Sequence, residues 1–185
     1  MSGFASIYGG GSDDIDSGSG DDTIVSGGGN DTVDAGSGDD MVLAGTGDDE
    51  VTLGSGNDTA YGFTGDDLLA GGTGDDRLYG GTGDDTIIGG GGDDTMEGES
   101  GADTFEFDDG FGHDLIIGFH IGDDTLQIAS GINGTAVADP ADLLPLISAD
   151  SFGNAVITLG TDTITLQGIT VGDLTANLGT IVQVV

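Results

Sequence analysis

The sequence predicts an all-β protein: a right-handed parallel β-roll, a β-helix-like solenoid closed by a β-rich C-terminal capping segment. Three observations predict this fold class. Glycine contributes 40 of the 185 residues, the formal net charge is −34, and one nine-residue pattern recurs in phase through more than half of the chain. Short repeated units that cannot bury an apolar face alone are typical of solenoids, in which each unit stacks on its neighbours.

The composition limits the partners that the chain can have. It contains 35 acidic residues and a single basic side chain, Arg77. So strong a negative charge excludes nucleic-acid binding and adhesion to an anionic membrane. Membrane insertion is not expected either, because no segment approaches the roughly 18 apolar residues of a membrane span. The natural partners are hard cations such as Ca²⁺, which prefer carboxylate and carbonyl oxygens.

The repeat runs from Tyr8 to Glu106 as eleven consecutive nonapeptides without an insertion or deletion. Position 4 is always Gly, and position 8 is always apolar. Position 2 is Gly in nine repeats, with Phe63 and Glu99 as exceptions. Position 6 is always Asp, namely Asp13, Asp22, Asp31, Asp40, Asp49, Asp58, Asp67, Asp76, Asp85, Asp94 and Asp103.

The two halves of the repeat predict different local structures. The glycine half predicts a sharp turn through backbone conformations that a Cβ would forbid. The half after the Asp carries one apolar residue between variable neighbours, which predicts a very short strand with one buried face. Two repeats then complete one coil, and the chain winds into two stacked parallel sheets with the position-8 side chains between them.

Stacking has an electrostatic consequence for the aspartates. Each turn lies above the turn two repeats away at a spacing of about 4.8 Å, so the position-6 carboxylates form a row along each edge. Like charges at this spacing repel one another, and a row of them requires bound cations. Eleven turns on alternating edges predict about nine sites between stacked turns. Position 5 is Asp or Asn in nine repeats, and we interpret these side chains as solvated.

The nonapeptides resemble the repeats-in-toxin (RTX) family, whose GGxGxDxUx consensus forms calcium-binding β-rolls. SGSGDDTIV, AGTGDDEVT, GGTGDDRLY and GGTGDDTII carry this resemblance. It implies that one turn offers carbonyls at positions 2 and 4 with its position-6 carboxylate. The turn two repeats later then offers carbonyls at positions 1 and 3 with its own carboxylate. One implied site comprises Gly72, Gly74 and Asp76 with Gly89, Gly91 and Asp94. The implied glycine ligands at positions 2 and 4 are Gly9, Gly11, Gly18, Gly20, Gly27, Gly29, Gly36, Gly38, Gly45, Gly47, Gly54, Gly56, Gly65, Gly72, Gly74, Gly81, Gly83, Gly90 and Gly92.

Beyond Glu106 the strict nine-residue period ends, although the spacing of Gly, Asp and an apolar residue recurs. We therefore divide the chain into the β-roll, residues 1–106, and a C-terminal segment, residues 107–185. Within this segment GHDLII and GDDTLQ read as degenerate repeats separated by short insertions. Their aspartates, Asp114 and Asp124, are either additional metal ligands or plain turn residues.

The rest of the C-terminal segment predicts a loop followed by strands. Residues 129–150 contain both prolines and predict a loop with one helical turn around residues 140–146. Short strands are expected at 155–159, at 162–169 and at the C-terminus. This segment is suited to cap the last coil, whose apolar edges would otherwise be exposed.

The stretch DTFEF…GHDLIIGF…GDDTLQI…DTITLQGIT resembles the region that closes β-rolls in secreted RTX proteases, lipases and alginate epimerases. This resemblance implies an uncleaved C-terminal signal that is read by a type I secretion system. The N-terminus, MSGFASIYGG, has no basic stretch and no apolar run, so a cleavable signal peptide is not expected. The lack of cysteine is compatible with an extracellular location. We expect a secreted, extracellular or cell-surface protein.

No enzymatic activity is predicted, because the sequence contains no HExxH, GxSxG, Walker or dinucleotide-binding motif. His113 and His120, the only histidines, lie in turn-like sequence and are interpreted as surface residues. Tyr61 and Tyr79 occupy position 9 two repeats apart and are expected to stack on one sheet. They are either ordinary strand residues or a small sugar-binding or contact patch. Position 3 is Thr or Ser in eight repeats, a hydroxyl ladder of the kind that some RTX-like proteins present to ice.

We therefore expect a calcium-dependent extracellular structural or interaction protein, as part of a matrix, a surface layer or an adhesive filament. A second interpretation is a non-catalytic C-terminal RTX module of a secreted hydrolase or polysaccharide epimerase. A third is an ice-binding or adhesin module. Little sequence precedes the first coil, so calcium-dependent homo-oligomers through this N-terminal coil are also expected.

Overall fold

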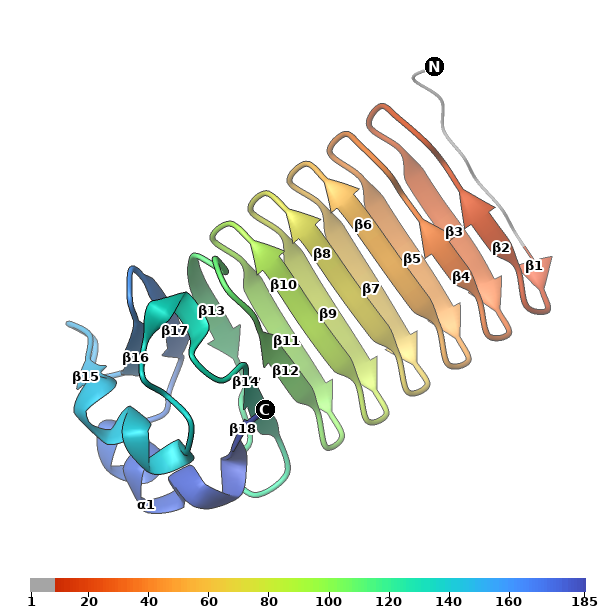
Figure 1. The fold of residues 1–185 in the computed structure, drawn as a ribbon. Coiled ribbons are helices and arrows are strands. Elements are labelled where there is room, and N and C mark those ends of the chain that lie inside the picture. The colour runs from red at the N-terminus through yellow and green to blue at the C-terminus, as the bar shows by residue number, and fades with distance from the viewer. Residues whose placement is uncertain (1–8) are drawn as a thin grey trace.

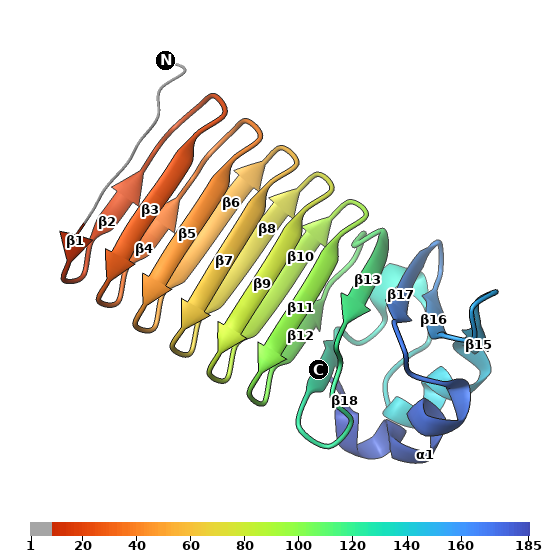
Figure 2. The same cartoon turned by 180° about the vertical axis from the view of Figure 1, so that it is seen from behind.

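A computed structural model describes residues 9–185, which form a two-layered roll that ends in a cap (Figure 1 and Figure 2). The start of the first predicted repeat, Tyr8, lies outside the described residues. Through the repeats, consecutive strands alternate between two sheets, so the chain winds as a coil and advances along one axis. The predicted parallel β-roll is confirmed.

The two sheets contain all of the strands in residues 9–185, and each sheet combines repeat strands with strands of the cap. The first sheet contains, in spatial order, β1 (Gly9–Gly10), β3 (Thr23–Gly28), β5 (Met41–Thr46), β7 (Thr59–Thr64), β9 (Arg77–Thr82), β11 (Thr95–Ser100), β13 (His113–Ile117), β17 (Asp162–Leu166), β16 (Ala155–Leu159) and β15 (Ile147–Ala149). The second sheet contains β18 (Val182–Val184), β14 (Thr125–Ile128), β12 (Thr104–Phe107), β10 (Thr86–Gly91), β8 (Leu68–Thr73), β6 (Glu50–Ser55), β4 (Thr32–Asp34) and β2 (Asp14–Asp16).

The register between neighbouring strands confirms that two nonapeptides complete one coil. Thr59 pairs with Arg77, and Arg77 pairs with Thr95, in steps of 18 residues. Every residue of a repeat therefore stacks on the residue at the same position two repeats away. This exact superposition of like on like places the acidic and glycine positions in continuous columns along the roll.

Many strands are longer than the very short ones that the pattern predicts, because they continue through positions 1 to 3 of the next repeat. In β6, for example, Gly54 has a φ of 101° and still pairs with Gly72 of β8. Glycine tolerates this left-handed conformation without losing its place in the ladder. The turn is thereby reduced to positions 4 to 6, which brings the position-6 Asp close to the strands on both sides of it.

The core between the sheets has two inward positions per repeat instead of the single one predicted. All position-8 side chains are buried, as predicted. Position 1 also points inward, where Ala44 and Leu53 are fully buried and Gly71 is buried as well. Because small residues dominate position 1, the middle of the roll has a thin core. The core becomes bulkier toward the cap, where Phe105 and Phe107 are buried.

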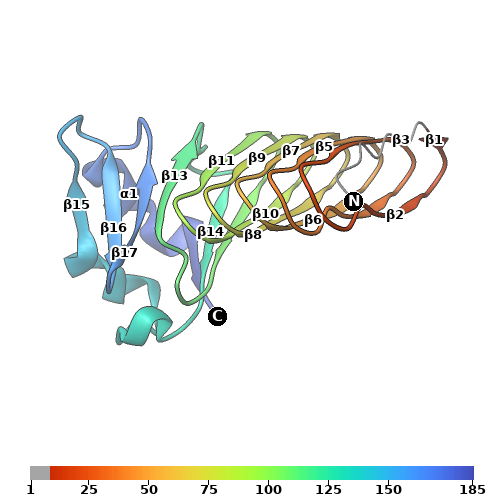
Figure 3. The same cartoon turned by 90° about the horizontal axis from the view of Figure 1, so that it is seen from above.

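The cap continues both sheets beyond the repeats (Figure 3). The degenerate repeats form β13 and β14, which extend the two sheets by one coil. In the first sheet β17 then pairs with β13, and in the second sheet β18 pairs with β14. Strands from the end of the chain thus cover both open edges, as the predicted capping role requires.

The α-helix α1 (Val171–Ile181) was not predicted, because the sequence analysis expected only strands after residue 150. Thr170 caps the helix by accepting a hydrogen bond from the Asp173 N–H at 3.2 Å. Leu174, Leu178 and Ile181 recur at helical spacing and are buried, and this signal was missed. The short helices η1 (Ile132–Gly134) and η2 (Pro140–Leu146) occupy the predicted loop, and η2 is the predicted helical turn. Within residues 9–185, no helix is long and apolar enough to cross a membrane.

The position-4 glycines provide a test of this stacking. Gly74 has a φ of 121°, and a Cβ there would collide with the carbonyl oxygen of Gly56 in the stacked turn. We expect Gly74→Ala to lower the free energy of unfolding by about 2 kcal/mol or more, measured by thermal or urea denaturation in calcium. The matched control is Gly179→Ala in α1, where a Cβ would meet nothing within 4 Å. This control is expected to be neutral or stabilising by up to about 1 kcal/mol, and equal losses in both variants would contradict the stacking argument.

Candidate metal centre

The position-6 aspartates form two continuous rows, one along each edge of the roll, as predicted. Those from Asp22 to Asp103 are all buried, with at most 3% of their surface exposed. From Asp31 onward, each one accepts a hydrogen bond at Oδ1 from the backbone N–H of the aspartate 18 residues earlier. The Asp58 N–H donates to Asp76 at 2.8 Å, and the Asp76 N–H donates to Asp94 at 2.8 Å. The turn between the strands therefore holds each carboxylate in a fixed orientation.

The second carboxylate oxygen of these residues has no hydrogen-bond partner. This Oδ2 atom is buried and unpaired in Asp13, Asp22, Asp31, Asp40, Asp49, Asp58, Asp67, Asp76, Asp85, Asp94, Asp103 and Asp114. A buried acceptor without a partner costs about 1–3 kcal/mol, and more when it is charged. Such atoms are rare in folded proteins, so a regular series of them indicates a ligand that carries positive charge.

The unpaired oxygens face the backbone carbonyls of the stacked turn. A Cβ placed on Gly71 would meet both Asp76 Oδ2 and the carbonyl oxygen of Gly89, the latter at 2.5 Å. The same arrangement recurs at Gly62, between Asp67 Oδ2 and the Gly80 carbonyl oxygen. Two hard oxygen donors from stacked turns therefore share one small space. Calcium binds such donors at about 2.3–2.6 Å, so the residues fit the ion that the sequence resemblance implies.

The carbonyls at positions 2 and 4 form columns along the roll. A Cβ on Gly72 would collide with the Gly54 carbonyl oxygen, and one on Gly74 would collide with that of Gly56. These two positions require glycine because each stacked carbonyl fills the space that a side chain would need. In the described residues, no three His, Cys, Asp or Glu side chains converge on one point. A cation site here must therefore combine carboxylates with backbone carbonyls.

Burial raises the pKa of the aspartates in the middle of the rows. The pKa is raised to about 6 in Asp58, Asp67 and Asp94, and to about 7 in Asp76 and Asp85. Desolvation is the main cause, and the charges of stacked aspartates add to it. The hydrogen bond from the stacked backbone N–H opposes the rise but does not cancel it. The roll thus places its carboxylates where a nearby positive charge stabilises them most.

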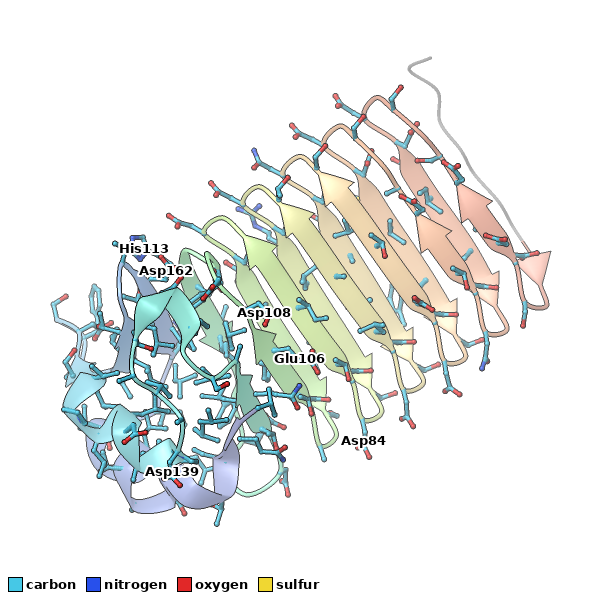
Figure 4. The ribbon with its side chains drawn as sticks, in the orientation of Figure 1. Asp84, Glu106, Asp108, His113, Asp139 and Asp162 are labelled. Atoms are coloured by element: carbon cyan, nitrogen blue, oxygen red, sulfur yellow. The ribbon has the colours of Figure 1, made fainter. Side chains whose placement is uncertain are left out.

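The position-5 side chains are exposed, yet they are more than the solvated groups that the sequence analysis predicted. Asp66 accepts a hydrogen bond from the Asp84 N–H at 2.8 Å, and Asp84 accepts one from the Ala102 N–H at 2.8 Å. These bonds run toward the following turn, whereas those of position 6 run toward the preceding one. Asp84 projects outward from the edge in Figure 4. These hydrogen bonds add to the predicted solvation, because the fixed register of the turns brings a backbone N–H within reach of the position-5 side chain.

The two aspartates of the degenerate repeats continue the rows. Asp114 accepts from the Asp94 N–H at 3.0 Å, and Asp124 accepts from the Asp103 N–H at 3.2 Å. Burial raises the pKa of Asp114 to about 8, and its Oδ2 is unpaired. In Asp124 the second oxygen accepts from the His120 N–H at 2.8 Å. Asp114 therefore keeps the oxygen that a metal would need, whereas the second oxygen of Asp124 already has a partner.

Asp162 is a candidate residue that sequence reasoning missed. It lies at the start of β17, only 7% exposed, with an unpaired buried Oδ2, and its charge contributes to the raised pKa of Asp114. Figure 4 shows it close to His113, whose Nδ1 lies 3.1 Å from Thr163 Oγ1. The sequence did contain a signal for it: Asp162 lies two residues before the buried Ile164, in a strand whose buried and half-buried residues alternate. His113 and His120 themselves are exposed, as predicted.

Comparisons with known proteins agree with this geometry. The family model of the RTX calcium-binding nonapeptide repeat matches residues 7–42, 43–78 and 70–105. No curated protein matches the sequence significantly.

Two solved structures resemble the chain. An extracellular lipase from Serratia marcescens is 20% identical, with a TM-score of 0.41 over 94% of this chain and 39% of the lipase chain. A subunit of the mannuronan C5-epimerase from Azotobacter vinelandii is 23% identical, with a TM-score of 0.36 over 96% of this chain and 81% of that chain. This chain therefore spans only 39% of the length of the lipase.

Removal of an aspartate from the middle of a row is expected to weaken calcium binding more than removal at its end. Asp76 contacts stacked turns on both sides, whereas Asp13, within residues 9–185, contacts only the turn of Asp31. In calcium titrations followed by circular dichroism, Asp76→Ala should raise the calcium midpoint more than Asp13→Ala does. Equal shifts would show that ions are not shared along the rows.

The raised pKa values predict a pH dependence with a definite sign. The ordinary Asp value is 3.8, and values of about 6 to 8 in the folded roll mean that it holds protons that the unfolded chain has released. Without a cation, the stability of the roll should therefore fall as the pH rises from about 4 to 8. Calcium must displace these protons, so its midpoint should rise as the pH is lowered from 8 to 6. Titrations at several pH values, with proton release followed in weak buffer, measure both effects, and a constant midpoint without proton release would contradict the buried-carboxylate site.

Proposed function

Because the chain belongs to the family of RTX calcium-binding nonapeptide-repeat proteins, we propose that it is an extracellular structural or interaction protein whose β-roll folds when calcium binds. The observation that carries this proposal is the double row of buried carboxylates, each with one oxygen unpaired and aimed at stacked carbonyls. A bound calcium ion would supply the positive charge that these oxygens lack. The chain itself supplies orientation, because each carboxylate is held by a backbone N–H of the neighbouring turn.

We propose ion sites between stacked aspartates along both rows. The eleven repeats alone predict about nine sites between stacked turns. Asp114 and Asp124 add one stacked pair to each row, so that eleven such pairs are hydrogen-bonded in all. Of these two additional sites, the one next to Asp114 has the better support, because the Oδ2 atom of Asp114 has no hydrogen-bond partner.

We further propose that the protein acts outside the cell without catalysing a reaction. Millimolar calcium, typical of the extracellular medium, would fold the chain after export, and a type I secretion system would read the C-terminal segment. The sheets provide long exposed surfaces and no cluster of catalytic groups is evident in the part of the chain that the structure describes. A role in a matrix, a surface layer or an adhesive filament fits such an extended shape.

Self-association through the N-terminal coil remains part of the proposal. Within residues 9–185, β1 and β2 each pair with a single strand, so each sheet ends there with one unpaired edge. At the other end β17 and β18 cover β13 and β14, and the strands that end the two sheets there, β15 and β18, also pair with one strand each. An open edge is a template for pairing with another chain, and sedimentation with and without calcium would reveal it.

Folding is expected to require calcium. Circular dichroism should show a disordered spectrum in chelator and a β-sheet spectrum in millimolar calcium, because ions that bind only the native state stabilise it. The charge of −34 also opposes folding when no cation is bound. Magnesium should replace calcium poorly, since it resists dehydration and demands a tighter geometry. A protein that is fully folded in chelator would contradict the proposal.

Residues 107–185 are proposed to act as the cap that nucleates the roll, distinct from the repeat unit 1–106. A chain truncated after Glu106 should then remain largely unfolded in millimolar calcium, because its last coil would lack β13 and β14 as stacking partners. Circular dichroism against calcium measures this. If the truncated chain folds with the midpoint of the full protein, the segment serves only export.

A further inference from the structure

The outer faces of the two sheets differ in chemistry. On the first sheet, the position-9 side chains that stack along the roll include Leu43, Tyr61 and Tyr79. On the second sheet, the equivalent positions include Asp16 and Asp34. Aromatic side chains therefore gather on one outer face, whereas the equivalent positions of the second sheet carry no aromatic residue. Such a local patch on a chain with a net charge of −34 indicates a site of interaction.

The aromatic rings of this face are ordered by the strand spacing. Tyr61 and Tyr79 are stacked, with ring centroids 4.8 Å apart and planes within 7° of each other. This separation equals the spacing of neighbouring strands, so both rings stand across the roll and face along its axis. Phe63 lies 5.9 Å from Tyr61, and its plane is tilted by 32° relative to the tyrosine ring. The ring face of Phe63 therefore also looks along the axis, toward the neighbouring strand β9.

A hollow lies beside Phe63 where β9 carries no side chain. Gly81 pairs with Phe63 on one side and with Glu99 on the other. The hollow measures about 300 Å³ and is lined by Tyr61, Phe63, Tyr79, Gly80, Gly81 and Glu99. Two strand spacings, about 9.6 Å, separate the strands of Phe63 and Glu99. This leaves room for one planar group stacked on the Phe63 ring at about 3.5–4 Å, and the remaining distance of about 6 Å is spanned by the Glu99 side chain, whose carboxylate would meet the edge of that group.

The two residues at the ends of this hollow occupy costly backbone positions. Phe63 and Glu99 are the only position-2 residues of the repeats that are not glycine, and their φ angles are 74° and 68°. A left-handed conformation costs a side-chain-bearing residue about 1–2 kcal/mol. Residues held in such conformations cluster at functional sites. That both exceptions border one hollow indicates that their side chains serve a ligand there.

We propose that this hollow, the Phe63–Glu99 slot, binds a planar organic cation of the guanidinium class, such as an arginine side chain. The Phe63 ring and Tyr79 offer aromatic surface to a cation, and the Glu99 carboxylate offers the opposite charge. The chain charge of −34 attracts cations and disfavours anions throughout this surface. A planar group matches the space between ring and carboxylate better than a tetrahedral ammonium does. The slot requires only the folded roll, so its failure would leave the calcium proposal intact.

The test is an NMR titration of the full chain in saturating calcium. N-acetyl-arginine amide should shift the Gly81 amide and the Tyr79 ring signals, whereas N-acetyl-citrulline amide, planar and uncharged, should not. A short glycine–serine peptide with one arginine is the second probe. Binding of both arginine probes assigns the slot to the free cation as well, and binding of the peptide alone assigns it to a partner polypeptide. If citrulline binds as well as arginine, or neither arginine probe binds, the proposal is wrong.

Variants separate the slot from general attraction to an acidic protein. Phe63→Gly and Glu99→Gln should each weaken arginine binding by about five- to tenfold, an effect typical of one cation–π or charge-assisted contact. The matched control is Glu50→Gln, which removes the same charge from an exposed site on the second sheet. An equal loss in Glu50→Gln would reduce the binding to non-specific attraction and overturn the proposal.

The melting temperature of a Glu99 variant distinguishes a ligand-binding role of Glu99 from a structural role. Glu99 is exposed and its side chain makes no hydrogen bond with residues 9–185, so Glu99→Gly should relieve its backbone strain. The melting temperature in calcium should rise by about 2–4 °C while arginine binding is lost. A lower melting temperature would show that Glu99 is retained for folding and would overturn its assignment to a ligand.

Discussion

The structure depends on one electrostatic constraint, which is the burial of like charges at the spacing of β-strands. Strand pairing fixes successive coils about 4.8 Å apart, and every coil contributes an aspartate to each edge. Backbone N–H groups stabilise one oxygen of each carboxylate and leave the other unpaired. The roll cannot relax this repulsion by moving side chains apart, because the ladder sets their separation. Only protons or cations can remove it, which is the physical basis of the proposal that folding and ion binding are coupled.

The same constraint accounts for the glycines and for the thin core. Turns that are stacked in register leave no room for a Cβ at positions such as Gly72 and Gly74, where carbonyls of the preceding coil approach. Small residues at position 1, such as Gly71, leave space in which Asp76 Oδ2 and the Gly89 carbonyl meet. Each of these choices reduces the apolar area that the roll can bury. The proposed ion binding would therefore supply stability that larger domains obtain from hydrophobic burial.

The apolar core is bulkier at the cap than in the middle of the roll. Phe105, Phe107 and the apolar face of α1 supply a bulky core at one end, where β17 and β18 also complete the sheets. A stable end surface is what a solenoid needs, since each coil is stabilised mainly by its neighbours. On the outer face, Phe63 and Glu99 depart from the glycine rule at a cost in backbone strain. Departures from the strict repeat thus occur in the cap and at the proposed Phe63–Glu99 slot.

The sequence by itself determined the β-roll, its two-repeat coil and the aspartate rows, because a strict period translates directly into stacking and register. It also predicted the capping role and placed Asp114 and Asp124 in line with the repeats. Only the tertiary structure revealed Asp162, the helix α1 and the hydrogen bonds of the position-5 side chains. Asp162 and α1 lie beyond loops of irregular length, and although the apolar residues of α1 recur at helical spacing, the repeat pattern carries no information about which segments meet there. The hydrogen bonds of the position-5 side chains depend instead on how closely the stacked turns approach each other. Likewise, the slot at Gly81 exists because register places Phe63 and Glu99 on either side of it, although they are 36 residues apart in the chain.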